Sequence, residues 1–436
     1  LPLDGNPREH AQAREAFNAG AAALFVPESE LENALTVLAN HGQSQRSRES
    51  EHPMALRHPA SPHLPMPAWA PTEVSGSAMS ALDRWFVELV QANPQLRIRI
   101  GNPDELASNK MGATLALLKH RVNVPEPGVP ESTDGSVVTA LNEEAVAAAA
   151  LANKGGLNLI VSYEAFAVKM LGLIRQEIIF ARRQKELGQP PGWISIPLVV
   201  TSHTWENSKN EQSHQDPTIG EALLGEMSDT ARVLFPVDEN TACAALRAVY
   251  ASRGQVACVV VSKRDTPNHF SAAAAQSLIE HGAAHVAGDP STAQLQFVAI
   301  GAYQLEEALK AHARLEHHGL ASCITVVVEP GRLRIPRDEL EAAFVLGDES
   351  LQALFPPHLP RVLISHTRPE PMLGVLRRID SGPSKTRALG YINHGGTLDV
   401  AGMLIANRCT WVDAIYAAAQ VTGWNSSQAA AAATDA

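Results

Sequence analysis

The segment Ile194–Pro217 reads ISIPLVVTSHTWENSKNEQSHQDP, an apolar run that passes directly into a polar loop. The run Ile194–Val200 is typical of a buried strand in a parallel sheet, because helices cover both faces of such a strand. The loop carries His203 and His214 among asparagine, glutamine and aspartate side chains. Ligands of α/β proteins bind at the carboxyl ends of parallel strands. From the residues alone, a ligand-binding loop and a solvated surface loop both stay open.

The same alternation of apolar and amphipathic runs extends to both sides of this segment. Strands are predicted over 96–100, 157–162, 194–200, 231–235 and 256–262, and helices over 79–90, 143–152, 163–187 and 239–252. This order predicts an α/β protein with a parallel sheet wrapped by helices. After about residue 270 the alternation restarts, with strands over 297–301, 323–328 and 361–365 and a helix over 304–318. A second, smaller α/β domain is therefore expected.

These patterns divide the chain into four parts. Two helix-like pieces, over 8–23 and 28–40, precede a stretch rich in serine, proline and histidine. We predict an irregular linker segment over 1–75, a first α/β domain over 76–270, a second domain over 271–425 and a disordered alanine-rich tail over 426–436.

Composition excludes several classes of protein. The net charge of −11 and the lack of a basic stripe argue against nucleic-acid binding. No apolar run reaches the ~20 residues of a membrane helix, and none resembles a secretory leader. The four cysteines lack metal-ligand spacing, which predicts reduced core residues of a cytoplasmic protein. The chain begins with Leu1 rather than methionine, so whether this is a true terminus stays open.

Further candidate residues stand at predicted strand ends and helix starts. The stretch GNPDELASN (101–109) places Ser108 after one strand, and SYEAF (162–166) places Tyr163 and Phe166 after the next. Glu143 opens an alanine-rich helix, and Lys263 ends the strand 256–262. Such positions converge on one edge of a doubly wound sheet. Each also has a plainer interpretation: a helix-start acid, aromatic packing or a solvated strand-end charge.

Six motifs in this order resemble the phosphoketolases, thiamine diphosphate enzymes that cleave ketose phosphates. They are GNPDELASN (101–109), DGSVVTALNEE (134–144), SYEAF (162–166), TSHTWENSKNEQSHQDP (201–217), VLFPVDENT (233–241) and VVVSK (259–263). The likeness covers about residues 94 to 265 and continues more loosely to GYINHGGTLDVAGMLIANRCTW (390–411). It implies a pyrimidine-binding domain followed by a transketolase-like C-terminal domain.

The resemblance also implies roles for individual residues. Glu143 matches the catalytic glutamate that contacts the cofactor's aminopyrimidine, and Phe166 matches the aromatic that stacks on that ring. His214 matches a histidine that shuttles protons to the sugar. The residues implied to line the substrate and phosphate channel are Ser108, Tyr163, Asn210 and Lys263. An imidazole suits proton transfer, and a cation with hydroxyls suits phosphate.

The implied function is that of the C-terminal part or subunit of a phosphoketolase. Such a lyase cleaves xylulose 5-phosphate or fructose 6-phosphate with inorganic phosphate, giving acetyl phosphate and an aldose phosphate; which sugar is preferred stays open. The cofactors implied are thiamine diphosphate and Mg²⁺. No GDG…N diphosphate signature is visible in this sequence, and no metal ligands are predicted on it. The diphosphate and metal site is expected on a missing domain or a partner chain, and a homodimer or heteromer is expected.

Departures from the family pattern keep two alternatives open. Lys209 stands where the family has a histidine, and Glu211 and Gln212 stand where it has Gly-Phe. A negative charge at Glu211 is unfavourable near a phosphate. The alternatives are a catalytically degenerate protein kept as a dimerisation or regulatory partner, and half of a split transketolase-type enzyme with another donor.

Overall fold

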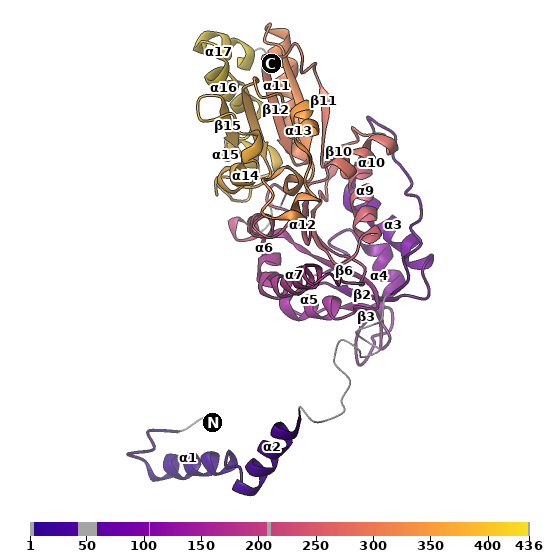
Figure 1. The fold of residues 1–436 in the computed structure, drawn as a ribbon, viewed down its shortest axis with the longest axis vertical. Helices are drawn as coiled ribbons and strands as arrows, with labels where there is room; N and C mark the ends of the chain where they lie inside the picture. The colour runs from indigo at the N-terminus through magenta and orange to yellow at the C-terminus, as the bar shows by residue number, and fades with distance from the viewer. Residues whose placement is uncertain (1–3, 42–58, 104, 207–210, 435–436) are drawn as a thin grey trace. The chain divides into compact units, whose positions relative to one another are not determined.

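The structure is a computed structural model that describes residues 4–41, 59–103, 105–206 and 211–434 (Figure 1). The chain separates into two compact units, residues 1–57 and residues 58–436. In the first unit the two expected helical pieces are present as α1 (Ala11–Ala23) and α2 (Glu28–Asn40). The remaining elements belong to the second unit, which carries all the described candidate residues.

An eight-stranded sheet organises the first half of the second unit. Its order is β4-β3-β5-β2-β6-β7-β9-β8, and every pairing in it is parallel. The five longer strands fall on the predicted runs: β2 (Arg97–Gly101), β6 (Gly156–Tyr163), β7 (Ile196–Thr201), β8 (Ala231–Leu234) and β9 (Val256–Val260). The short strands β3 (His120–Arg121), β4 (Glu131–Ser132) and β5 (Val137–Val138), which extend the sheet beyond β2, were not predicted, since two residues leave no periodic signal.

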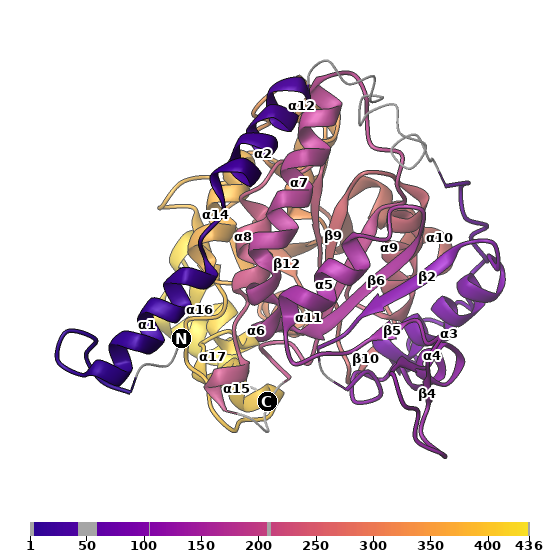
Figure 2. The same cartoon turned by 90° about the horizontal axis from the view of Figure 1, so that it is seen from below.

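Helices cover both faces of this sheet (Figure 2). Alternate residues of a strand point to opposite faces. Leu159 and Val161 of β6 accordingly join the apolar core shared with α3 (Ala78–Gln91) and α9 (Glu239–Ala251), whereas Ile160 joins the core under α5 (Glu143–Leu151) and α7 (Leu171–Glu186). The remaining helices of this part are α4 (Gly112–Leu118), α6 (Glu164–Ala167), α8 (Thr218–Leu224) and α10 (Ala272–His281). Burial on both faces explains the uninterrupted apolar strand sequences.

A second, five-stranded sheet forms the C-terminal half. Its order is β11-β13-β12-β14-β15, with β11 antiparallel and the other pairs parallel. The strands are β11 (Ala283–Ala287), β12 (Leu295–Ile300), β13 (Ser322–Val327), β14 (Arg361–Ser365) and β15 (Thr386–Leu389). The helices are α11 (Ala302–His317), α12 (Glu339–Ala342), α13 (Asp348–Leu354), α14 (Pro369–Val375), α15 (Val400–Ala406), α16 (Trp411–Thr422) and α17 (Ser426–Thr434). Both large apolar cores contain residues of both sheets, which makes 58–436 one compact unit.

The predicted linker ends earlier than residue 75. Within it, residues 42–58 lie outside the described residues, but residues 59–71 run over the first domain as an extended segment. Asn93 exchanges two hydrogen bonds with the backbone of His63 (2.7 and 2.8 Å), and Asn240 does the same with Ala70 (2.8 and 2.9 Å). The serine, proline and histidine composition of this segment did not predict the attachment, because the side chains that form these hydrogen bonds lie elsewhere in the chain.

The predicted disordered tail is wrong for residues 426–434, which form α17. Asn425 and Gln428 exchange hydrogen bonds of 2.9 and 3.0 Å at its start, and Ala429 and Ala432 are buried. Alanine has the highest helix propensity, and its small side chain allows close packing on neighbouring helices. A run of alanines therefore indicated a helix rather than a frayed end. No helix among the described residues is long and apolar enough to cross a bilayer.

Candidate active site

The described candidate residues gather beyond the carboxyl ends of the parallel strands. Tyr163 ends β6, Ser108 lies in the turn after β2, and Lys263 follows β9. Glu143 begins α5, where the Asn142 side chain accepts a hydrogen bond from the amide of Ala145 at 2.9 Å and caps the helix. The parallel topology thus delivers side chains far apart in sequence to one edge, as expected.

Hydroxyl groups and one ammonium group form the part of the site near β2 and β9. Lys263 Nζ donates to Ser202 Oγ at 2.5 Å and to the carbonyl of Ser108 at 3.1 Å, and it lies 5.6 Å from the centre of the Tyr163 ring. Ser108 Oγ and Tyr163 OH lie 3.2 Å apart. A cation surrounded by hydroxyls in this way can bind a phosphate ester.

Aromatic rings form the centre of the site. Phe166, on α6, lies 5.9 Å from the Tyr163 ring and 4.7 Å from the His214 imidazole, which meets it edge-on (centroid distances). His214 belongs to a short 3₁₀ helix, Gln212–His214, and its Nδ1 lies 2.9 Å from Ser213 Oγ. The structure therefore brings Phe166, Tyr163 and His214 into direct contact.

A lysine that the sequence analysis missed completes the cluster. Lys169 Nζ donates to Glu143 Oε1 at 2.7 Å and lies 4.8 Å from the centre of the Phe166 ring. It therefore contacts both residues to which the family resemblance assigns the cofactor's aminopyrimidine. Lys169 lies three residues after Phe166, about one helical turn further along the chain. This spacing could have indicated that the two side chains are neighbours. Asn210, the remaining candidate, lies outside the described residues, as does Lys209.

The second half of the chain anchors the loop that carries His214. Gln212 Nε2 donates to the carbonyl of Asn393 at 2.7 Å, and Tyr391 OH donates to the carbonyl of Gln215 at 2.9 Å. The Gln215 amide pairs with Gly396 through two hydrogen bonds, of 2.9 and 3.0 Å. The loosely matching segment 390–411 thus has a positioning role at the site.

A buried layer of ionisable groups lies next to these residues. Glu164 Oε2 accepts hydrogen bonds from the amide and the hydroxyl of Thr204, both at 2.8 Å, and Glu164 Oε1 lies 2.9 Å from His366 Nε2. Burial alone would raise the pKa of the Glu164 carboxyl, but the imidazoles of His366 and His203 outweigh it and lower that pKa. Glu164 is thereby held as a carboxylate at the junction of the two sheets.

Glu206 is the second carboxylate of this layer. It accepts hydrogen bonds from Tyr303 OH at 2.6 Å, from the Lys263 amide at 2.9 Å and from the Ser262 hydroxyl. Its Oε1 lies 3.8 Å from His203 Nε2. Burial would raise the pKa of Glu206, but the His203 imidazole and the hydrogen bonds lower it; burial lowers the pKa of His203. Sequence reasoning named only His203 of this layer and missed its partners, since His366, for example, comes from the other sheet.

Two groups of residues suit a bound cofactor or metal. Glu143 and Phe166 offer a carboxylate and an aromatic ring, which fit an aminopyrimidine once Lys169 moves aside. Glu164, His203 and His366 offer donor atoms that all lie within 4.8 Å of one another, although the sequence predicted no metal ligands.

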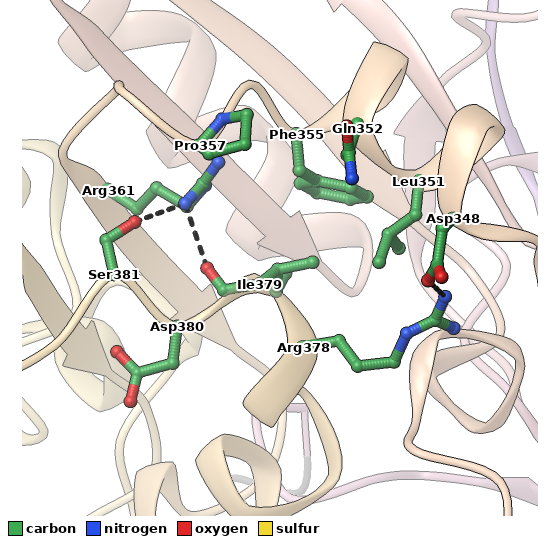
Figure 3. Close-up of a pocket in the computed structure, with 10 residues that line it drawn as sticks. All are labelled: Asp348, Leu351, Gln352, Phe355, Pro357, Arg361, Arg378, Ile379, Asp380 and Ser381. Atoms are coloured by element: carbon green, nitrogen blue, oxygen red, sulfur yellow. Dashed lines mark hydrogen bonds and ion pairs between the residues drawn. The ribbon is translucent and has the colours of Figure 1, made fainter.

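A separate pocket of about 260 Å³ lies at the opposite edge of the second sheet (Figure 3). Arg361, at the amino end of β14, lines it and donates to the carbonyl of Ile379 at 3.0 Å and to the Ser381 hydroxyl. It also donates to Gln296 Oε1 at 2.9 Å and to the carbonyl of Pro356 at 2.6 Å. Because these bonds are internal, we interpret the arginine as a structural residue.

Sequence comparison agrees with this geometry. The family model described as D-xylulose 5-phosphate/D-fructose 6-phosphate phosphoketolase matches residues 80–252. Over these residues the chain is similar to the phosphoketolases. A probable phosphoketolase of Lactococcus lactis subsp. lactis (strain IL1403) is 27% identical over 292 residues, which are 64% of this phosphoketolase-like chain and 35% of that protein. Four such relatives are covered over only 33% to 50% of their lengths, so the chain spans at most half of them.

Solved structures confirm the predicted fold class of this phosphoketolase relative. A transketolase from Leishmania mexicana superposes with a TM-score of 0.60 at 19% identity, over 83% of this chain and 47% of that one. A chain described as a split gene transketolase, inactive beta4 tetramer, superposes with a TM-score of 0.54 at 16% identity, over 80% of this chain and 98% of that one. The fold is therefore that of the pyrimidine and C-terminal domains of transketolase-like enzymes.

Proposed function

We propose that this chain is the pyrimidine-binding and C-terminal part of a thiamine diphosphate-dependent phosphoketolase. The reaction cleaves xylulose 5-phosphate or fructose 6-phosphate with inorganic phosphate, to acetyl phosphate and an aldose phosphate. The observation that carries the proposal is the continuous set of contacts from Glu143 through Lys169 and Phe166 to Tyr163, and on to the channel residues Ser108 and Lys263, with His214 against Phe166. It lies within the stretch that matches the phosphoketolase family model.

The aminopyrimidine end of the cofactor fits Glu143 and Phe166. When bound, thiamine diphosphate supplies a nucleophilic carbon for the ketose carbonyl and accepts the electron pair released by carbon–carbon cleavage. The Glu143 carboxylate would hydrogen-bond the ring nitrogen and hold a proton there, and the Phe166 ring would pack against the aminopyrimidine. Both contacts require Lys169 to leave its present position.

The substrate's phosphate and hydroxyl groups fit the opposite end of the cluster. Lys263 and the hydroxyls of Ser108 and Tyr163 bind the phosphate; Asn210 joins them from the part of the loop outside the described residues. With its Nδ1 beside Ser213, His214 uses Nε2 to exchange a proton with a sugar oxygen. Glu211 places a negative charge in the same loop, which weakens phosphate binding and predicts slow turnover.

The diphosphate and Mg²⁺ are assigned to a further domain or a partner chain. Two findings support this division. The chain spans at most half of the four relatives, and it aligns with nearly the whole of one chain of an inactive split-gene transketolase tetramer. The chain by itself is therefore expected to lack turnover.

Reconstitution tests the proposed activity. The purified chain is incubated with xylulose 5-phosphate, phosphate, thiamine diphosphate and Mg²⁺, with and without the diphosphate-binding segment of a phosphoketolase, and acetyl phosphate is measured as its hydroxamate. We expect product only in the complete mixture, and its loss in Glu143→Gln. Formation of product by the chain alone would contradict the assignment of the diphosphate and Mg²⁺ site to another domain or chain. Association of the chain with that segment, without binding of thiamine diphosphate and without product, favours the second function below.

A degenerate partner protein is the second candidate function. The Glu143–Lys169 ion pair favours it, because this carboxylate already has a cationic partner where the cofactor's ring belongs. Under this alternative the chain associates with a diphosphate-binding partner and regulates or completes a dimer without catalysis. Association without cofactor binding in the reconstituted mixture distinguishes it from the enzyme.

A further inference from the structure

Three ligand-type side chains meet where the two sheets join. Glu164 follows β6, His203 follows β7 and His366 follows β14, so each stands just beyond the carboxyl end of a strand. Their exposed fractions are 1%, 3% and 2%, and one donor atom from each lies within 4.8 Å of the others. The three segments are distant in sequence, since Glu164 and His366 are 202 residues apart.

One of these donors is unsatisfied in the protein. His203 Nδ1 is buried and has no hydrogen-bond partner in the described structure. Buried side-chain nitrogens are nearly always paired, and leaving one unpaired costs about 1–3 kcal/mol. The other ring nitrogen of His203, Nε2, faces Glu206 Oε1 at 3.8 Å, so Nδ1 is the atom available to a ligand.

The surroundings resemble the outer shell of a metal site. Thr204 fixes Glu164 through Oε2, which directs Oε1 toward His366. Glu206 is itself fixed by Tyr303 and by the Lys263 amide, and it faces the far nitrogen of His203. A carboxylate that accepts a hydrogen bond from the far nitrogen commonly fixes the ring of a metal-binding imidazole. Glu206 occupies that place, although 3.8 Å is longer than a hydrogen bond and the two groups must approach each other to form one.

Charge favours a cation at the same place. Among the described residues, the ion pairs recorded for Glu164 and Glu206 are both with imidazoles, and both carboxylates are almost fully buried. A buried carboxylate without a matched cation is costly. A divalent ion between Glu164 and the two histidines supplies positive charge that does not depend on protonation of either imidazole.

We propose that Glu164, His203 and His366 bind a divalent transition-metal ion of the Zn²⁺ class, which ties the two sheets together beneath the candidate active site. Two imidazole nitrogens and one carboxylate oxygen suit zinc rather than Mg²⁺, which prefers oxygen ligands. Metal–ligand distances of about 2.0–2.1 Å place neighbouring ligand atoms about 3.3 Å apart. The donor atoms reach this arrangement if the 2.9 Å Glu164–His366 contact opens by a few tenths of an ångström and His203 closes in.

Metal binding is measured on the full chain without any cofactor, so its outcome is independent of the proposed phosphoketolase activity. The protein is purified without chelator, its metal content is determined by plasma mass spectrometry, and metal-free protein is titrated with Zn²⁺ against a chromogenic chelator. We expect one equivalent per chain, and a rise in melting temperature of about 5 °C at 100 times the dissociation constant. Titration with Co²⁺ should give the visible absorption of a tetrahedral site.

Matched variants locate the site. His203→Gln removes the ligand nitrogen and should abolish the stoichiometric equivalent and the Co²⁺ absorption, whereas His317→Gln, at an exposed histidine outside the cluster, should change neither. Circular dichroism verifies that both variants fold. Wild-type protein that binds neither Zn²⁺ nor Co²⁺, or equal binding by the His203 variant, overturns the proposal and leaves the cluster as a hydrogen-bonded Glu–His network.

Discussion

At the residue scale, the contact that most affects the candidate site is the one made by Lys169. Its ammonium group bridges Glu143 and Phe166, although 58% of its side-chain surface is exposed. Exposed ion pairs contribute only about 0–1 kcal/mol. We therefore expect the pair to weaken the proposed cofactor binding without forbidding it, and a substitution can measure how much.

Replacing Lys169 tests this competition. Lys169→Met removes the cation while keeping an apolar stem, and it should tighten thiamine diphosphate binding to the reconstituted protein by up to about 5-fold. Lys169→Arg keeps the charge and is the matched control, which should leave the affinity near that of the wild type. Calorimetry with Mg²⁺ and the diphosphate-binding segment measures both. Weaker binding in Lys169→Met would mean that the lysine helps to hold the cofactor.

At the element scale, strand and helix termini set the positions of the site residues. Tyr163 and Phe166 are fixed because β6 passes directly into α6, and Glu143 is fixed because Asn142 caps α5. Ser202 has a left-handed backbone (φ 44°), which turns the chain sharply between β7 and His203. Short connections of this kind leave the side chains little freedom, which pre-organises a binding site.

The C-terminal helix α17 allows a matched test of packing at this scale. Ala432 is buried and Ala431 is exposed on the same helix, so aspartate at either position carries the same helix-propensity cost. Ala432→Asp should lower the free energy of unfolding by about 2–3 kcal/mol more than Ala431→Asp, because only the former buries a charge. Urea unfolding measures both. Equal effects would restore the interpretation of this segment as a disordered tail.

At the scale of the whole molecule, a buried ion pair joins the two halves of the second unit. Arg232 of β8 binds Glu329, which follows β13, through two hydrogen bonds of 2.7 and 2.8 Å. Burial would raise the pKa of Glu329, but the charges and hydrogen bonds of Arg232 and Arg332 outweigh it and lower that pKa below its ordinary 4.5. Folding therefore favours the ionised carboxylate.

This linkage predicts a dependence of stability on pH. Since the folded-state pKa of Glu329 is lowered, its contribution is fully present well above pH 4.5 and is lost as pH falls through the lower, folded-state value. Glu329→Gln leaves Arg232 buried without its anion and should cost about 3–5 kcal/mol at neutral pH. Unfolding free energies from pH 7 to pH 3 should fall less steeply in the variant. If the unfolding free energy falls equally with pH in both proteins, the loss of stability in acid is due to other carboxylates.

Association of chains is the second expectation at this scale. In α5, Val146, Ala147 and Ala150 pack inside their own domain, whereas Ala145 is exposed and Ala148 and Ala149 are partly exposed. Half of this helix is therefore available for the predicted pairing. We expect light scattering at micromolar concentration to give twice the mass of the chain, and Ala148→Glu to reduce it toward that of one chain. If the wild-type chain stays monomeric, even with a diphosphate-binding partner present, α5 does not form an interface between chains.

The sequence by itself determined the central strands of both sheets and the edge at which the site lies. Runs such as Ile196–Val200 and Val256–Val260 are apolar at every position and β-branched at three of five, which is typical of buried parallel strands. Topology then requires the polar residues after these strands to share one edge. That is why the stretches around Ser108, Glu143 and Tyr163 were expected at one edge before the fold was known, whereas the family resemblance added Lys263.

Only the tertiary structure decided what those residues touch. Lys169 and Glu143 are 26 residues apart, Gln215 and Gly396 are 181 apart, and Glu164 and His366 are 202 apart. Periodicity and capping signals act over a few residues, so they carry no information about such pairs. The same holds for the segment 59–71, whose attachment depends on Asn93 and Asn240. The partners of the site's charges and the buried ligand cluster result from packing two sheets together, which local sequence does not encode.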